Sequence, residues 1–355
     1  MSSSTASGSE PQETRAFVGS FTSAGGRGVL TAAVDPKTGA LTPLGATDAV
    51  ADPSYLALSA DRRLLYAVSE TGQGAVAAFD VTDALPRPAG EPVPVGGGSP
   101  THLALAAGHL VAANYGSGSV SVLPLRADGT PGPASCVLSH RGGGPDQDRQ
   151  EGPHAHQVLP DPSGRWVLSV DLGTDSVRVC VLTPDTGTLV VHAEVALRPG
   201  TGPRHLVFHP TGAYAYVVNE LTTTVTVCRW EAATGTLTPL SEAPLLPEEP
   251  TEGRSYASEG VVAHDGRFLW VANRGHDSIS VLELTAGGER AALRTTVPCG
   301  GHWPRDLALD PTGTRLYAAN ERSGDVTWFD VDPRTGVPRR AGSVAAPAAS
   351  CVVFG

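Results

Sequence analysis

The sequence predicts an all-β chain folded as a seven-bladed β-propeller with four-stranded blades, and three observations support this prediction. First, 42 Gly and 30 Pro are spread along the 355 residues as turn punctuation, while apolar residues still make up 40% of the chain. This composition favours many short strands over a helical bundle. Second, one strand–turn–strand phrase recurs about every 50 residues, a spacing typical of propeller repeats. Third, the two chain ends supply complementary parts of one further repeat.

The recurring phrase consists of an apolar strand, a turn such as Asp-Pro-x-Gly, and a second apolar strand that ends in a polar residue. A third strand of alternating polarity follows, as in residues 278–284, and often an Asp-x-x-Thr-Gly turn before a fourth. Four short strands in a repeat of about 50 residues indicate a propeller blade. Successive repeats start at Tyr55, His102, His156, His205, Gly260 and Asp306.

The chain ends are expected to form one blade together. Residues 15–21 match the second strand of a repeat, so the chain begins without a first strand, and residues 350–354 have the pattern of an orphan first strand. Pairing the two segments supplies the seventh blade and closes the ring, which removes exposed sheet edges. One domain is therefore expected over residues 14–355, and residues 1–13, rich in Ser with Gly and Glu, are expected to form a disordered tail.

The charge and residue usage exclude several classes of partner and chemistry. The net charge of −11 disfavours nucleic-acid and anionic-membrane partners. Lys37 is the only lysine, which disfavours Schiff-base catalysis and a phosphate-binding Gly-Lys loop. Five cysteines without a Cys-x-x-Cys pair disfavour a disulfide framework or structural zinc, and they favour a reducing, cytoplasmic location. No run of 18 apolar residues is present to cross a membrane, and the oligomeric state is left open.

The predicted topology gathers two columns of residues at one mouth of the central channel. Because the first two strands of a blade form an antiparallel hairpin, the start of the first and the end of the second lie on one face. At these positions the apolar alternation gives way to ionisable residues, which indicates a functional site. The first column is expected to contain Tyr55, His102, His156, His205, Gly260, Asp306 and Cys351, and the second Phe21, Glu70, Tyr115, Asp171, Glu220, Arg274 and Glu321.

Two arginines and a glutamate at this mouth suit acid–base and anion chemistry. Arg204 comes one residue before the first column, and Arg274 ends a strand otherwise made of core residues. Both guanidinium groups can bind anions or stabilise a developing oxyanion. Glu220 is a candidate general base whose pKa would be set by the charges of the arginines. Because Glu220 and Arg274 occupy the same place in successive blades, their side chains are expected to approach one another across the mouth.

A long polar loop, residues 142–156, delivers His154 and His156 to the mouth. Their i, i+2 spacing puts both imidazoles on one side of a strand, where they could transfer protons. Asp171 lies nearby in the predicted fold, but a catalytic metal site needs three close protein ligands and no third close one appears. No metal and no cofactor are therefore expected. The side chains expected to line the substrate site are His154, His205, Asp171 and Tyr115.

Four motifs in order resemble the propeller-type lactonase family, which includes seven-bladed 6-phosphogluconolactonases and fungal 3-carboxy-cis,cis-muconate cyclases. They are RQEGPHAH at 149–156, GPRHLVFHP at 202–210, VVNEL at 217–221 and VANRGHDSI at 271–279. The resemblance runs from about Phe17 to the C-terminus. It implies no metal and a catalytic group of His, Arg, Glu and Arg. These map onto His156 (or its neighbour His154), Arg204, Glu220 and Arg274.

The resemblance implies a hydrolase that opens a sugar lactone, 6-phosphogluconolactone above all. Water activated by Glu220 or His156 would attack the carbonyl, while one arginine stabilises the oxyanion and the other holds the phosphate. The alternative is a cycloisomerase of the muconate cyclase type, in which the same residues close a lactone, so the expected partner is a small anionic lactone or diacid. A non-enzymatic protein-binding propeller would not need convergent His, Arg and Glu side chains. No Gly-x-Ser-x-Gly motif supports a covalent serine mechanism.

Overall fold

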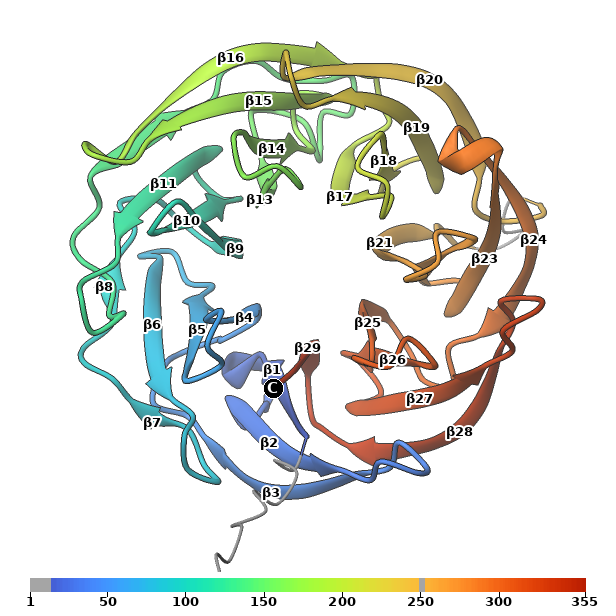
Figure 1. The fold of residues 1–355 in the computed structure, drawn as a ribbon, viewed down its shortest axis with the longest axis horizontal. Coiled ribbons are helices and arrows are strands. Elements are labelled where there is room, and N and C mark those ends of the chain that lie inside the picture. The colour runs from blue at the N-terminus through green and yellow to red at the C-terminus, as the bar shows by residue number, and fades with distance from the viewer. Residues whose placement is uncertain (1–13, 249–252) are drawn as a thin grey trace, which may run out of the picture.

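The computed structural model describes residues 14–248 and 253–355, and in this part of the chain seven antiparallel sheets are arranged around a central channel (Figure 1). The predicted seven-bladed propeller is confirmed. The predicted tail, residues 1–13, lies outside the described residues. No helix among the described residues has the length and apolar character needed to cross a membrane.

The strands of each blade are named here from the channel outward. Blade 1 contains β29 (Ala349–Phe354), β1 (Arg15–Ser20), β2 (Val29–Val34) and β3 (Leu41–Thr47); blade 2 contains β4 (Leu56–Leu58), β5 (Leu64–Ser69), β6 (Ala75–Asp80), β7 (Arg87–Pro88) and β8 (Val93–Pro94); blade 3 contains β9 (Pro100–Ala106), β10 (His109–Asn114), β11 (Ser119–Pro124) and β12 (Cys136–Ser139). Blade 4 contains β13 (Ala155–Pro160), β14 (Val167–Asp171), β15 (Ser176–Thr183) and β16 (Thr188–Ala196); blade 5 contains β17 (Pro203–Phe208), β18 (Tyr214–Asn219), β19 (Thr224–Glu231) and β20 (Thr236–Pro244). Blade 6 contains β21 (Tyr256–Val262), β22 (Phe268–Arg274), β23 (Ser278–Thr285) and β24 (Arg290–Pro298); blade 7 contains β25 (Pro304–Leu309), β26 (Arg315–Asn320), β27 (Asp325–Val331) and β28 (Pro338–Ala345).

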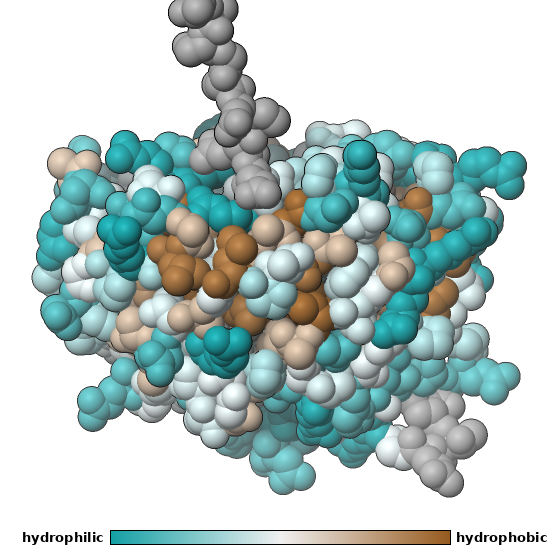
Figure 2. Space-filling view, turned by 90° about the horizontal axis from the view of Figure 1, so that it is seen from below, coloured by the Kyte–Doolittle hydropathy of each residue, from teal (hydrophilic) through white to brown (hydrophobic). Residues whose placement is uncertain are grey.

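Two details complete this outline. In blade 2 the outer strand is split into β7 and β8, which both pair with β6. Two single-turn 3₁₀ helices, η1 (Thr22–Ala24) and η2 (Ala286–Gly288), lie in connecting segments. The outer wall over β3 and β28 carries a band of apolar residues at mid-height, with hydrophilic residues along both rims (Figure 2).

Ring closure occurs as the sequence predicts. Strand β29 pairs antiparallel with β1, with Phe17 opposite Val353 and Val18 opposite Val352. The Arg15 amide also donates a 3.0 Å hydrogen bond to the Gly355 carbonyl. One blade therefore contains both chain ends, and β1 and β29 complete it by pairing with each other.

Burial explains the two kinds of strand sequence. Strands β10 and β22 are buried along their whole length, and their sequences are correspondingly continuous in apolar or small residues. The outer strand β24 alternates between exposed and partly buried residues. Seven apolar clusters fill the spaces between adjacent blades. Burial of inner strands on both faces therefore supplies the core.

A repeated β-bulge sets the side chains that face the channel. In blade 5, Pro203 pairs with Asn219 and His205 with Val218, so Arg204 is an extra residue in the first strand. A residue in the left-handed region precedes the strand, as in Gly202 with φ of 58°. Such a bulge re-aims side chains and is common beside functional sites.

The bulge recurs around the ring and creates two sets of channel residues. The bulge ring comprises the extra residues Ser54, Thr101, His156, Arg204, Ser258, Arg305 and Ser350. The second ring comprises the residues that follow them, Tyr55, His102, Gln157, His205, Glu259, Asp306 and Cys351. Each second-ring residue is one position farther along its strand from the mouth.

This register corrects the expected columns at three positions. His156 belongs with Arg204 in the bulge ring and not with His205, because the bulge inserts a residue that apolar periodicity does not reveal. In blade 6 the channel residue is Glu259, whereas Gly260 already pairs with Val271. In blade 4, Asp171 pairs with Ala155 and so lies one residue before the mouth.

Candidate active site

Where the inner strands meet, the two rings enclose a central cavity of about 20 Å³. That volume holds about one water molecule. A substrate would therefore meet these side chains from the mouth of the channel. The cavity is lined by Ser54, Tyr55, Glu70, Thr101, His102, His156, Arg204, His205, Glu259, Arg305, Asp306 and Ser350.

Glu220 is the centre of a buried arginine cluster at the mouth. Its carboxylate lies 2.6 Å from Arg274 Nη2, 2.5 Å from Arg149 Nη2 and 3.4 Å from Arg204 Nε. The predicted approach of Glu220 and Arg274 is confirmed. Burial alone would raise the pKa of Glu220, but Arg274, Arg149 and Arg204 outweigh it and lower that pKa to about 2. The carboxylate is therefore a weak base that orients the guanidinium groups.

Arg204 is the member of this cluster with unused hydrogen-bond donors. Within residues 14–248 and 253–355 its buried Nε has no hydrogen-bond partner, and its Nη1 lies 3.8 Å from Glu259, beyond hydrogen-bond length. Arg274, by contrast, also donates to the carbonyls of Tyr256 and Ala257, at 3.3 and 3.2 Å. Burial and the charge of Arg274 lower the pKa of Arg204. An anion that reaches Arg204 from the mouth would satisfy both the donors and the charge.

Arg149 is a site residue that the sequence interpretation missed. It lies in the loop before β13, and its side chain is 31% exposed at the mouth. Besides Glu220 it contacts the hydroxyl of Tyr115, at 3.5 Å, and its guanidinium lies 5.7 Å from the ring centroid of Tyr256. The first residue of the RQEGPHAH motif was the available signal, although only the histidines of that motif were assigned roles.

A fourth arginine, Arg305, occupies the bulge ring of blade 7. Its guanidinium lies 3.6 Å from Glu70 and 3.4 Å from Glu321, and 4.8 Å from the ring centroid of Phe21. The Ser54 hydroxyl donates a further hydrogen bond to Glu70. Sequence analysis placed Glu70, Glu321 and Phe21 at the mouth but missed the arginine that joins them, because periodicity skipped the bulge.

The two candidate histidines have different surroundings. His156 lines the cavity, and burial together with Arg204 and Arg305 lowers its pKa well below the usual value, so its imidazole is neutral and, like the Glu220 carboxylate, a weakened base. The His154 ring stacks on Tyr115 with centroids 4.4 Å apart, and its Nδ1 is hydrogen-bonded to the Tyr115 carbonyl at 2.9 Å. Tyr115 also packs edge-on against His156. His156 is therefore the histidine placed for proton transfer in the cavity.

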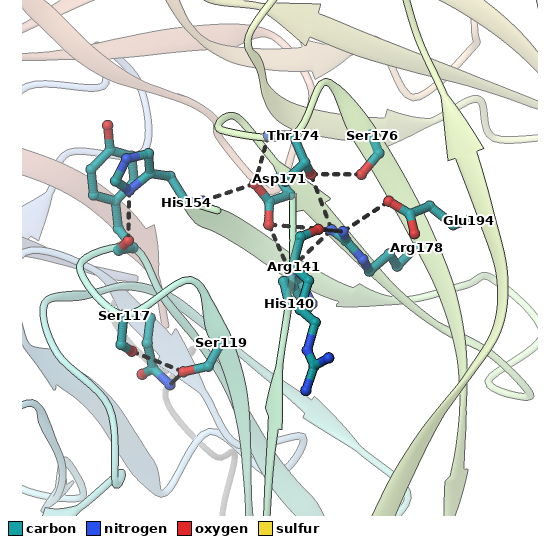
Figure 3. Close-up of polar contacts among 12 residues, drawn as sticks. Ser117, Ser119, His140, Arg141, His154, Asp171, Thr174, Ser176, Arg178 and Glu194 are labelled. Carbon is teal, nitrogen blue, oxygen red and sulfur yellow. Dashed lines mark hydrogen bonds and ion pairs between the residues drawn. The ribbon is translucent and has the colours of Figure 1, made fainter. Parts of the chain in front are cut away.

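Asp171 does not lie where the sequence interpretation expected. Its carboxylate is fully buried within blade 4, 2.6 Å from His140 Nδ1 and 3.2 Å from Arg178 Nη1 (Figure 3). It also accepts the backbone N–H groups of His154 and Thr174, at 2.8 and 3.1 Å. Because these contacts occupy the carboxylate and it is absent from the cavity lining, its place is in the scaffold behind the mouth.

His205 lines the cavity from the second ring, where its Nε2 lies 2.5 Å from Glu259 Oε1. Glu259 was missed because the repeat alignment selected Gly260. Among the residues that the structure describes, no group of three or more His, Cys, Asp or Glu side chains has the geometry to hold a metal ion.

Comparison with known proteins covers the whole propeller. A family profile described as "Lactonase, 7-bladed beta-propeller" matches residues 15–354. The 6-phosphogluconolactonase of Bacillus subtilis (strain 168) is 33% identical over 347 residues, which is 95% of this chain and 97% of that protein. The periplasmic gluconolactonase of Pseudomonas aeruginosa has a TM-score of 0.89 at 29% identity, over 96% of this chain and 98% of its own. A protein from Lactobacillus plantarum has a TM-score of 0.90 at 30% identity, over 97% and 99%.

Proposed function

The chain belongs to the lactonase family of seven-bladed β-propellers, and on that premise we propose that it hydrolyses an anionic sugar lactone, 6-phosphogluconolactone first among them. The observation that carries this proposal is the buried Arg204, which presents unused donors beside the neutral imidazole of His156. The relative from Bacillus subtilis, named a 6-phosphogluconolactonase, supports the choice of substrate.

In the proposed reaction, a water molecule attacks the lactone carbonyl carbon and gives one proton to His156. Arg204 stabilises the oxyanion of the tetrahedral intermediate, which is the largest expected electrostatic contribution. The ring C–O bond then breaks, and protonated His156 returns the proton to the leaving alkoxide. The second proton of the water stays on the new carboxyl group and is lost to solvent, so that the product is the open aldonate.

The remaining charged residues position these groups. Glu220, held ionised, fixes Arg274 and Arg204 against one another. Arg149 is the partly exposed arginine of the cluster, so it is suited to hold the phosphate at the outer end of the substrate. The charged phosphate and the reacting carbonyl of one substrate would then meet two arginines at different depths.

The test is a panel of 6-phosphogluconolactone, gluconolactone and an unsaturated tricarboxylate, each measured against an enzyme-free blank with and without a chelator. We expect the fastest acid release with the phosphorylated lactone, and the same rate in chelator. His156→Gln provides the matched variant, since an amide keeps polarity without basicity. No rate above the blank on either lactone would overturn the proposal, and lactone formation from the tricarboxylate would replace it with the cyclase alternative.

A further inference from the structure

The second ring contains titratable groups that the proposed reaction does not use. His102, His205, Glu259 and Asp306 all line the cavity and are at most 8% exposed. Buried charge is costly unless it is paired, so such a group is retained charged only beside a counter-charge. The protonation state of each group therefore depends on the charged side chains next to it.

Glu259 stands between a histidine and Arg204. Its Oε1 lies 2.5 Å from His205 Nε2, and its Oε2 lies 3.8 Å from Arg204 Nη1. The Gly260 amide donates to His205 Nδ1 at 3.4 Å, which leaves the proton of the neutral imidazole on Nε2, pointing at Glu259. The carboxylate is thus hydrogen-bonded on one side and has a long ionic contact on the other.

Glu259 in turn raises the pKa of three other titratable groups near it. They come from three further elements: Asp306 on β25, Tyr55 before β4 and Cys351 on β29. The Asp306 carboxylate accepts the Val352 amide at 2.8 Å. Burial, only partly offset by Arg204, raises the pKa of Glu259 to about 8, and burial with Arg204 lowers the pKa of His205 to about 3. Arg204 is the cation that stabilises the ionised carboxylate.

We propose that Glu259 is a positioning residue that takes up one proton when an anionic ligand binds Arg204 and releases it when the ligand leaves. This inference rests on the proposed function. Where the pH exceeds the pKa of Glu259, about 8, the ionised carboxylate shares the charge of Arg204 before the ligand binds. A ligand anion on the unused donors of Arg204 brings a second negative charge to the same guanidinium, and a proton from solvent on Glu259 removes the repulsion. Arg204 therefore exchanges one anionic partner for another, while no other bond changes.

The proposal predicts a measurable proton stoichiometry. Above pH 8 free Glu259 is ionised, so aldonate binding should take up close to one proton and weaken about tenfold per pH unit. Below that pH the carboxyl already carries its proton, and binding should be nearly independent of pH. The stable probes are gluconate and 6-phosphogluconate, measured by calorimetry between pH 7.5 and 9.5, above the titration of the phosphate, in two buffers of different ionisation enthalpy.

Two variants separate Glu259 from its neighbours. Glu259→Gln is permanently neutral, so it should bind the aldonates without proton uptake and with a flat pH profile. Glu321→Gln is the matched control, because Glu321 lies 3.4 Å from Arg305 instead, and uptake should persist. A pH dependence retained in Glu259→Gln would show that another group titrates and would overturn the proposal.

The wild-type calorimetry tests the inference even if Glu259→Gln does not fold. Lactone turnover with aldonate binding but no proton uptake at pH 9 overturns the linkage and leaves the proposed function standing. Aldonates that do not bind, together with no lactone turnover, overturn both.

Discussion

Two buried carboxylates in neighbouring blades, Asp171 in blade 4 and Glu220 in blade 5, have similar partners and different uses. Both are paired with arginine, and both lie at the end of the second strand of a blade. Asp171 belongs to a network away from the cavity that is closed at its arginine, because Arg178 continues to Glu194 and to a backbone carbonyl, although the buried Nε2 of His140 has no partner among the described residues. The Glu220 cluster is open, because Arg204 keeps an unpartnered donor beside the cavity. A buried charge cluster is thus a candidate site where an arginine has unused donors and lines a cavity.

The strand register explains why Asp171 points into its own blade and not into the mouth. It aligns with Asn219 of blade 5, whose amide donates to Thr224 and Thr226 on the next strand, at 3.0 and 2.9 Å. We call this contact, between the side chain of the last second-strand residue and side chains of the third strand, the blade lock. In blade 4 the lock is charged, since Asp171 replaces the amide and Arg178 stands at the position of Thr226.

The charged lock also holds both ends of one loop (Figure 3). Arg178 Nη2 donates to the carbonyl of Arg141 at 3.2 Å, and Asp171 accepts the amide of His154. Between these two points lies the segment that carries Arg149 to Glu220. The charged residues of blade 4 therefore hold the loop that brings Arg149 to the site in blade 5.

The largest expected effect is on stability, from Asp171→Ala. Removing this carboxylate leaves buried His140 and the Nη1 side of Arg178 without their carboxylate, with only the half-exposed Glu194 remaining as a counter-charge, so we expect a loss of about 3–5 kcal/mol in the free energy of unfolding. The matched variant is Asn219→Ala, which removes the neutral lock of blade 5 and should cost about 1–3 kcal/mol. Denaturant unfolding measures both. Equal losses in the two variants would show that the charge adds nothing to the lock.

The next effect is on catalysis, from Arg204→Lys. Lysine keeps the charge but loses the planar fork, so the kcat/KM for the lactone should fall about 10²–10³-fold, as for a lost oxyanion donor. The melting temperature should change little. Arg178→Lys is the matched change in the Asp171 network, and it should lower the melting temperature while the folded molecules keep their kcat. If Arg204→Lys also lowers only the melting temperature and leaves kcat/KM unchanged, the Glu220 cluster has a structural role and no catalytic one.

How far the sequence predicts this molecule depends on the bulge. Repeat spacing and the chain ends yield the blades and their closure, because both follow from apolar pattern. The bulge adds one residue without changing that pattern, so the sequence interpretation placed His156 with His205 and chose Gly260 in place of Glu259. Counting from the residue before the bulge, proline in the case of Arg204 and Arg305, aligns the strands correctly.

Other features could not be obtained from pattern at all. The partners of Arg149 depend on the path of an irregular loop, and the pairing of Asp171 with His140 depends on side chains from two blades. The roles assigned to His154, Tyr115 and the other site residues stay predictions, as do the substrate and the cytoplasmic location, since one similar protein is described as periplasmic.

A third effect is the dependence of stability on pH that ionised Glu220 causes. Arginine contacts lower the pKa of Glu220 from 4.5 to about 2, so its stabilisation is complete above pH 4.5 and is lost as the pH falls towards 2. That shift corresponds to about 3 kcal/mol. Glu220→Gln has no such titration, so its stability relative to wild type should improve as the pH falls. Urea unfolding at pH 5, 4 and 3 measures the difference, and parallel curves would contradict the ionised cluster.

The smallest effect is expected from transplanting the neutral lock of blade 5 into blade 4, by Asp171→Asn with Arg178→Thr. Replacing both members of a buried ion pair is often near neutral, so the double variant should lie within about 1–2 kcal/mol of wild type, far above Asp171→Ala. The new amide oxygen can still accept the His154 amide, but nothing replaces the donor to the Arg141 carbonyl. We therefore expect a higher KM for the phosphorylated lactone with kcat unchanged, the pattern of weakened uniform binding, because the loop that carries Arg149 is tied at one end only. A double variant as unstable as Asp171→Ala would show that the blade needs charge at this position. An unchanged KM would show that the charged lock does not position Arg149.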